Sequence, residues 1–123
     1  NYRMPNINAA LGCAQLEQLE SYLVFKRELF GKYQDALIGK AGVRLMQESE
    51  FAKSNYWLQA LVFDNELEGD GLLNLFSQSG LKCRPIWKPL HLLSYLSDCP
   101  RSSLANAESL GGRVLNLPSM CVA

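Results

Sequence analysis

The longest periodic stretch of the sequence lies at its beginning and restricts the fold more than any other feature. Apolar side chains recur at steps of three and four residues from Ile7 to Leu37, and polar side chains fill much of the other side. This spacing predicts a helix of about nine turns. Gly12 and Gly31 lie inside the pattern and are expected to weaken or bend the helix, whereas Gly39 and Gly42 end it.

The rest of the chain alternates short β-prone runs with short helical runs. We predict strands or extended segments at 43–47, 56–63, 81–87 and 113–117, helices at 71–79 and from 102 or 103 to about 110, and a loop with one helical turn at 89–100. The 123 residues suit one domain. The order predicts an α+β fold, with a long N-terminal helix and a small, mainly antiparallel sheet on which helices pack.

The composition excludes several classes of partner. Lys plus Arg and Asp plus Glu number 12 each, so no basic excess indicates nucleic acid or a membrane surface. The four cysteines form no C-x-x-C pair and the chain has a single histidine, a spacing that predicts no metal site. We expect reduced, mostly packed thiols in a cytoplasmic protein.

Four motifs lie in order along nearly the whole chain. They are 1–12 (NYRMPNINAALG) with 14–19 (AQLEQL), 80–91 (GLKCRPIWKPLH), 105–110 (ANAESL) and 114–119 (VLNLPS). Together they resemble the signatures of the DegT/DnrJ/EryC1/StrS aminotransferases, which are fold-type I enzymes. The variants of the second and fourth motifs are most similar to the branch that makes amino sugars leading to nonulosonic acids such as legionaminic acid.

The resemblance implies that residues 1–123 are the small C-terminal domain of a homodimeric, cytoplasmic enzyme. The large domain would lie upstream of Asn1 and hold pyridoxal phosphate on a lysine, with the cofactor as electron sink. The reaction would move an amino group, usually from glutamate, to a nucleotide-linked keto-sugar for surface polysaccharide. No lysine of this chain lies in the family's lysine motif, so we expect this fragment alone to be inactive.

The first motif implies contacts with the cofactor and the substrate. Asn1 matches the family asparagine that reaches the cofactor phosphate of the other subunit, to which an amide can donate without adding charge. Arg3, with Tyr2 beside it, matches a position that can face the phosphates of the nucleotide-sugar. The alternative is a frayed terminus.

The second motif implies a substrate-binding loop stiffened by two prolines. Trp87 could offer a flat face to a sugar or base ring, and Arg84 or Lys88 could meet a phosphate. Trp87 could equally be a packing residue, and His91 could be structural rather than a substrate contact. Many family members carry a His-Tyr pair where this chain has Ile86 and Trp87.

Two alternatives to a transaminase remain open at the level of the sequence. One is an independent regulatory or interaction module of α+β type, since fold does not fix function. The other is a homologue of the same family that lacks the lysine and works as a sugar dehydratase.

Overall fold

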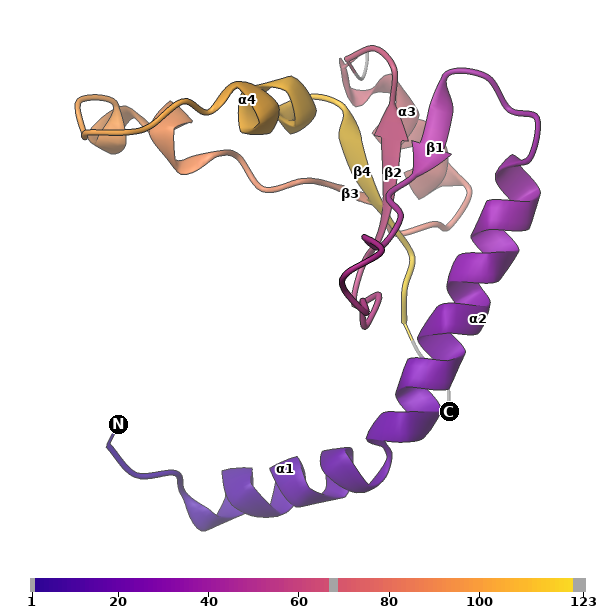
Figure 1. Cartoon of the computed structure of the whole chain (residues 1–123), viewed down its shortest axis with the longest axis vertical. Helices are drawn as coiled ribbons and strands as arrows, with labels where there is room; N and C mark the ends of the chain where they lie inside the picture. Colours follow the sequence, from indigo (N-terminus) through magenta and orange to yellow (C-terminus); the bar gives the residue numbers. More distant parts are fainter. Residues whose placement is uncertain (1, 67–68, 121–123) are drawn as a thin grey trace.

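The computed structural model describes residues 2–66 and 69–120, which form helices around one small sheet (Figure 1). The helices are α1 (Asn6–Glu17), α2 (Leu19–Leu37), α3 (Gly69–Gln78) and α4 (Ala105–Gly111), and the strands are β1 (Val43–Leu45), β2 (Gln59–Phe63), β3 (Arg84–Pro85) and β4 (Val114–Leu117). Two 3₁₀ turns, η1 (Leu90–Leu92) and η2 (Ser94–Leu96), lie between β3 and α4. The predicted order of elements and the α+β class are confirmed.

The four strands pair in the order β1-β2-β4-β3, and every pairing is antiparallel. β4, the last strand in the sequence, therefore lies between β2 and β3. In this register Leu61 is opposite both Leu45 and Leu115, while Arg84 is opposite Asn116. Directly opposite residues project to the same face of a sheet. Leu45, Leu61 and Leu115 therefore share one face, and Arg84 and Asn116 share the other.

The core lies between α2 and the first of these faces. Phe30 of α2 belongs to one buried cluster with Leu45, Tyr56, Leu61 and Leu117. Five partly buried side chains pack against the cluster, namely Tyr33, Leu37, Val43, Phe63 and Cys83. Burial of this apolar area stabilises the domain and positions α2 against the sheet.

The prediction of one long N-terminal helix is wrong, because the helix is interrupted at Gln18. Gln18 has φ −104° and ψ −1°, and its carbonyl accepts a hydrogen bond from the Ser21 hydroxyl at 2.7 Å. The predicted glycines do not mark the interruption: Gly12 lies within α1 and Gly31 within α2. α1 has no buried residue, whereas α2 packs on β1, so only the second part of the periodic stretch follows the sheet. Figure 1 shows α1 projecting away from the sheet.

Three smaller predictions also need correction. The strand predicted at 81–87 is limited to Arg84–Pro85, after which the Ile86 N–H donates to the Val114 carbonyl at 3.2 Å. The strand predicted at 56–63 begins at Gln59, since Tyr56 has a positive φ of 46° that a strand does not allow. Cys13 and Cys99 are exposed rather than packed, while Cys121 lies outside the described residues.

Candidate functional site

A cavity of about 530 Å³ lies over the end of β4, where five consecutive residues, 116–120, form one wall. The turn before β2 and the segment around β3 form the other walls. The complete lining is Lys26, Trp57, Leu58, Lys82, Arg84, Pro85, Trp87, Asn116, Leu117, Pro118, Ser119 and Met120. The volume falls in the range typical of small-molecule sites. Residues from α2, β3 and β4 therefore meet there only after folding.

The lining carries positive charge and, among the described residues, contains no Asp or Glu. The ammonium of Lys26 is already hydrogen-bonded within the cavity wall. It donates to the Trp57 carbonyl at 3.1 Å, to the Ser119 hydroxyl at 2.8 Å and to the Ser119 carbonyl. By contrast, Lys82 and Arg84 form no hydrogen bond or ion pair with any described residue and are exposed. Two cations are thus available to an anionic ligand.

Two tryptophans, Trp57 and Trp87, lie close together in the lining of the cavity. Their ring centroids are 6.3 Å apart and their planes are inclined by 32°. Trp57 is 66% exposed and Trp87 is 70% exposed, so neither indole belongs to the core. Large apolar side chains left this accessible beside a polar cavity are typical of a binding surface.

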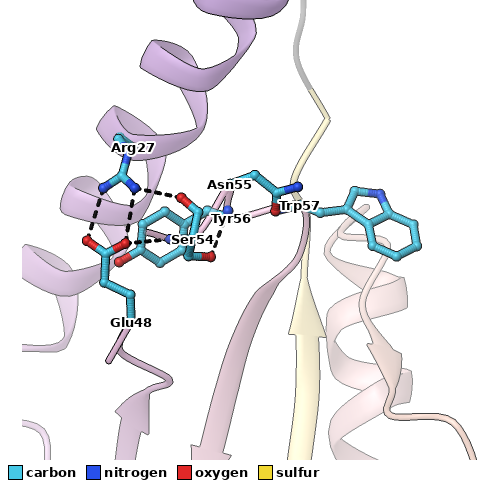
Figure 2. A network of polar contacts seen from close by, with 6 residues as sticks. All are labelled: Arg27, Glu48, Ser54, Asn55, Tyr56 and Trp57. Atoms are coloured by element: carbon cyan, nitrogen blue, oxygen red, sulfur yellow. Dashed lines mark hydrogen bonds and ion pairs between the residues drawn. The ribbon is translucent and has the colours of Figure 1, made fainter. Parts of the chain in front are cut away.

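An ion pair and its hydrogen bonds hold the turn that carries Trp57 (Figure 2). Arg27 of α2 donates from Nη1 and Nη2 to the two oxygens of Glu48 at 3.1 and 3.0 Å. The Ser54 N–H donates to Glu48 Oε2 at 2.7 Å, and Arg27 Nη2 donates to the Ser54 carbonyl at 2.6 Å. A bidentate pair fixes orientation as well as distance. We call Arg27, Glu48 and Ser54 the clamp.

The clamp also shifts the acid–base behaviour of its two charged members. The hydrogen bond from Arg27, followed by that from the Ser54 N–H, lowers the pKa of Glu48 below its ordinary value of 4.5. The hydrogen bond to Glu48 raises the pKa of Arg27. Each side chain is about one-third exposed, at 32% for Arg27 and 31% for Glu48, so the pair is partly screened by water. The main consequence of the ion pair is that it fixes the geometry of the turn that carries Trp57.

The residues that follow Ser54 are fixed in an unusual backbone conformation. Tyr56 has φ 46°, its N–H donates to the Ser54 hydroxyl at 3.0 Å, and its ring stacks on Phe30 with centroids 4.2 Å apart. The Trp57 N–H donates to the Asn55 side-chain oxygen at 3.0 Å. Figure 2 shows the ring of Tyr56 directed toward α2 and the indole of Trp57 directed away from it. One buried ring therefore anchors the turn and the next residue is presented to the cavity.

The structure brings together only two of the residues predicted to bind substrate, Arg84 and Trp87. Lys88 is exposed and does not line the cavity. Tyr2 and Arg3 are exposed near the start of α1, which Figure 1 shows far from the sheet. Asn1 lies outside the described residues.

His91 lies in a second cavity, of about 420 Å³, between η1 and α4. Its side chain is 9% exposed, and Nε2 lies 3.1 Å from Oε1 of Glu108. The two atoms are close without the alignment of a hydrogen bond. The residues of the second motif that were predicted to form one substrate site therefore lie in two cavities. The side chain of His91 is largely buried, whereas that of Trp87 is exposed.

Two residues that line the cavity, Trp57 and Lys82, were not predicted from the sequence. Trp57 stands in the aromatic run 56–63, which has the composition of a buried strand, and only the turn at Tyr56 exposes it. A signal for Lys82 was present, because it lies two residues before Arg84 in an extended segment and such residues share a face. Within the described part of the chain, no group of His, Cys, Asp and Glu side chains could hold a metal ion.

The sequence profile of the DegT/DnrJ/EryC1/StrS aminotransferase family matches residues 1–121. The chain belongs to this family. It is 34% identical over 124 aligned positions to the GDP-perosamine synthase of Vibrio cholerae, covering 97% of this chain and 33% of the relative. It is also 41% identical over 91 residues to EpsN of Bacillus subtilis (strain 168), which is provisionally named a pyridoxal phosphate-dependent aminotransferase, covering 74% of this chain and 24% of EpsN.

The fold also agrees with that of a solved structure. The crystal structure of DesV from S. venezuelae, in complex with a ketimine intermediate, superimposes with a TM-score of 0.82 at 24% identity. The match covers 95% of this chain and 32% of DesV. The chain thus spans about a quarter to a third of the length of these two relatives.

The described residues do not form a site for pyridoxal phosphate by themselves. A Schiff-base lysine needs an enclosed, accessible amine, and the ammonium of Lys26 is occupied by three oxygen acceptors. The other lysines are all exposed on the surface of the domain. No helix in the described part of the chain has the length and apolar character needed to cross a membrane.

Proposed function

We propose that this chain is the C-terminal domain of a pyridoxal phosphate-dependent aminotransferase that acts on a nucleotide-linked keto-sugar. The observation that carries the proposal is the family match over residues 1–121, which includes all four sequence motifs. The cofactor and its lysine would belong to a large domain preceding Asn1, because no lysine described here suits that role. This domain alone would therefore be inactive.

The cavity over β4 supports an anionic sugar substrate. Arg84 and Lys82 supply two uncommitted cations, and no carboxylate is present among the described lining residues to repel phosphate. Relatives from Vibrio cholerae and Escherichia coli O157:H7 are named as GDP-perosamine synthases, at 34% identity each. A nucleotide-linked sugar is the substrate class that fits both observations, with glutamate as the amino donor in the synthesis of surface polysaccharide.

The surface of α1 supports a larger assembly. Its side chains Ile7, Leu11 and Leu16 are 79%, 62% and 68% exposed, although each is large and apolar. Such a helix buries its apolar surface against another element. We propose that the large domain and the second subunit of a homodimer cover α1, which would carry Asn1 to the partner's cofactor phosphate and Arg3 to the substrate phosphates.

The test is turnover by the complete cytoplasmic protein loaded with pyridoxal phosphate. Glutamate and a panel of GDP- and UDP-linked keto-sugars are supplied, and 2-oxoglutarate and the amino sugar are measured. A legionaminic-acid-type branch predicts preference for a UDP- or GDP-linked precursor of that class. Loss of water from the sugar without transfer of nitrogen would identify a dehydratase instead, and absence of both reactions would favour the independent module.

Arg84→Gln provides a matched test of the cavity in the same assay. It should raise KM with little change in kcat, because Arg84 would contribute to substrate binding rather than to the reacting bonds. Arg101→Gln, on the exposed segment between η2 and α4, removes the same charge away from this cavity and is the control. Equal KM values for Arg84→Gln and the wild type would contradict this placement of the substrate.

A further inference from the structure

The segment between β3 and α4 brings Trp87 to the cavity over β4, and neighbouring elements hold it on both sides of this residue. We propose that His91 is a positioning residue for this segment, acting through Glu108 of α4 rather than by contact with substrate. The inference rests on the proposed function, because Trp87 and Arg84 line the cavity assigned there to the substrate. It gives His91 a different role from the substrate contact that the resemblance implied.

The sheet fixes the chain just before Trp87. β3 pairs with β4, and the Ile86 N–H that follows β3 donates to the Val114 carbonyl at 3.2 Å. The side chain of Trp87 is largely exposed, so burial in the core does not fix it. Its position therefore depends on how the chain is held on either side.

α4 fixes the chain after Trp87. Pro89 packs on Gly111 at the end of α4, where a Cβ atom would lie 3.6 Å from Cγ of Pro89. Two residues after Pro89, the side chain of His91 is 9% exposed, and its Nε2 lies 3.1 Å from Oε1 of Glu108. Glu108 and Gly111 are three residues apart and therefore lie on the same face of α4. Both contacts thus attach one short stretch of chain to one helix face.

α4 is a firm support because Arg113 ties it to the sheet. The Arg113 guanidinium donates to the Ser109 carbonyl and hydroxyl, each at 2.6 Å, and to the Asp64 carbonyl at 3.1 Å. The Phe63 N–H donates to the Arg113 carbonyl at 2.8 Å. A series of contacts therefore connects β2 through α4 and His91 to the segment that follows β3.

The imidazole of His91 depends on Glu108 because it is buried. A buried polar group without a partner costs free energy, and among the described residues Glu108 is the only carboxylate within ion-pair distance. Attraction between the two groups acts at this distance without the alignment of a hydrogen bond. Of the other residues that line this second cavity, only Arg101 carries a charge. His91 is thus directed to α4, and it does not line the cavity over β4.

A double-mutant cycle in the complete protein tests this pair, using KM and kcat for the keto-sugar nucleotide that is turned over. His91→Ala and Glu108→Ala should each raise KM about threefold or more and leave kcat nearly unchanged. The double variant should resemble either single variant, because each single change removes the same contact. His91→Gln keeps a side-chain N–H and should recover part of the affinity. Glu108 is 55% exposed, so Glu108→Ala and His91→Gln remain informative if His91→Ala does not fold.

Asn106→Ala is the matched control. Asn106 is exposed on α4 two residues before Glu108, so it lies on a different face of the helix, and it lines neither cavity. It should leave KM unchanged. Wild-type KM in Glu108→Ala, or effects that add in the double variant, would overturn the proposal, because His91 would not act through Glu108. A lower kcat at constant KM would overturn it as well, since this indicates only a loss of folded enzyme.

Fluorine NMR of the complete protein containing fluorotryptophan reports on the segment without any substrate. The Trp87 resonance is the one that Trp87→Phe removes. It should shift or broaden alike in His91→Ala and Glu108→Ala and stay unchanged in Asn106→Ala. A changed resonance without transamination refutes only the proposed function. Transamination with an unchanged resonance and unchanged KM in both variants refutes only the positioning role.

Discussion

Replacing Tyr56 by Gly and by Ala should reverse the usual order of stability of these two residues. Both variants lose the ring that is 7% exposed and stacked on Phe30, at a cost of about 3–5 kcal/mol. They differ in the backbone, because Tyr56 has φ 46°. A residue with a Cβ atom pays about 1–2 kcal/mol for this conformation and Gly does not, while Gly loses about 0.5–1 kcal/mol more through chain entropy.

The expected net result is that Tyr56→Gly is more stable than Tyr56→Ala by about 0.5–1 kcal/mol. At an ordinary position with negative φ, Ala would instead be more stable by about 0.4–1 kcal/mol. Urea denaturation of the 123-residue chain, followed by circular dichroism, measures the difference. With a slope near 1.5 kcal/mol/M, the two midpoints should differ by about 0.5 M.

Tyr56→Phe is the control, because it keeps the stacked ring and the backbone conformation. If both truncated variants are largely unfolded in buffer, sucrose added equally to all samples raises their stability without altering the comparison. A Tyr56→Ala protein as stable as Tyr56→Gly, or more stable, would refute the left-handed turn and with it the explanation of how Trp57 is presented.

Three further outcomes are expected. The stabilisation from Glu48 should be complete above its unfolded pKa of about 4.5 and should be lost as the pH falls through its lower folded pKa. In urea titrations, the difference in unfolding free energy between wild type and Glu48→Gln should therefore stay constant from about pH 8 to about 5 and become smaller below that. A difference that stays constant down to about pH 2 would contradict this expectation. Gln59 is 1% exposed; its amide nitrogen donates to the Lys26 carbonyl at 3.2 Å and to the Tyr56 carbonyl at 3.5 Å, while its Oε1 has no partner among the described residues. Gln59→Leu loses these two bonds but relieves the unpaired oxygen, so it should change the free energy of unfolding by less than about 1.5 kcal/mol, and a larger loss in urea denaturation would count against this account. Pyridoxal phosphate added to this chain should give no stoichiometric, borohydride-trapped adduct at one lysine, as judged by peptide mass mapping; a single fully modified lysine would disprove the proposed location of the cofactor site.

The sequence by itself determined the class of fold and the family. The apolar period from Ile7 onward predicts helix because it reflects local geometry, and it correctly placed α2 and its end before Gly39. Short β-prone runs likewise predicted the strands, with errors at their ends, because β2 begins only after the turn at Tyr56 and β3 is limited to Arg84–Pro85. Arg84 and Trp87 were found because they lie within one contiguous motif.

Only the tertiary structure decided which residues form the cavity. Trp57 precedes β2 and Trp87 follows β3. The two side chains meet because β4, which comes from the end of the chain, lies between β2 and β3. The interruption at Gln18 and the turn at Tyr56 depend on what each segment packs against, with α1 exposed and Tyr56 stacked on Phe30. The period and composition of the sequence reflect only residues that are close along the chain. The cavity, the interruption and the turn depend instead on contacts between segments distant in sequence, and these contacts exist only once the sheet has formed.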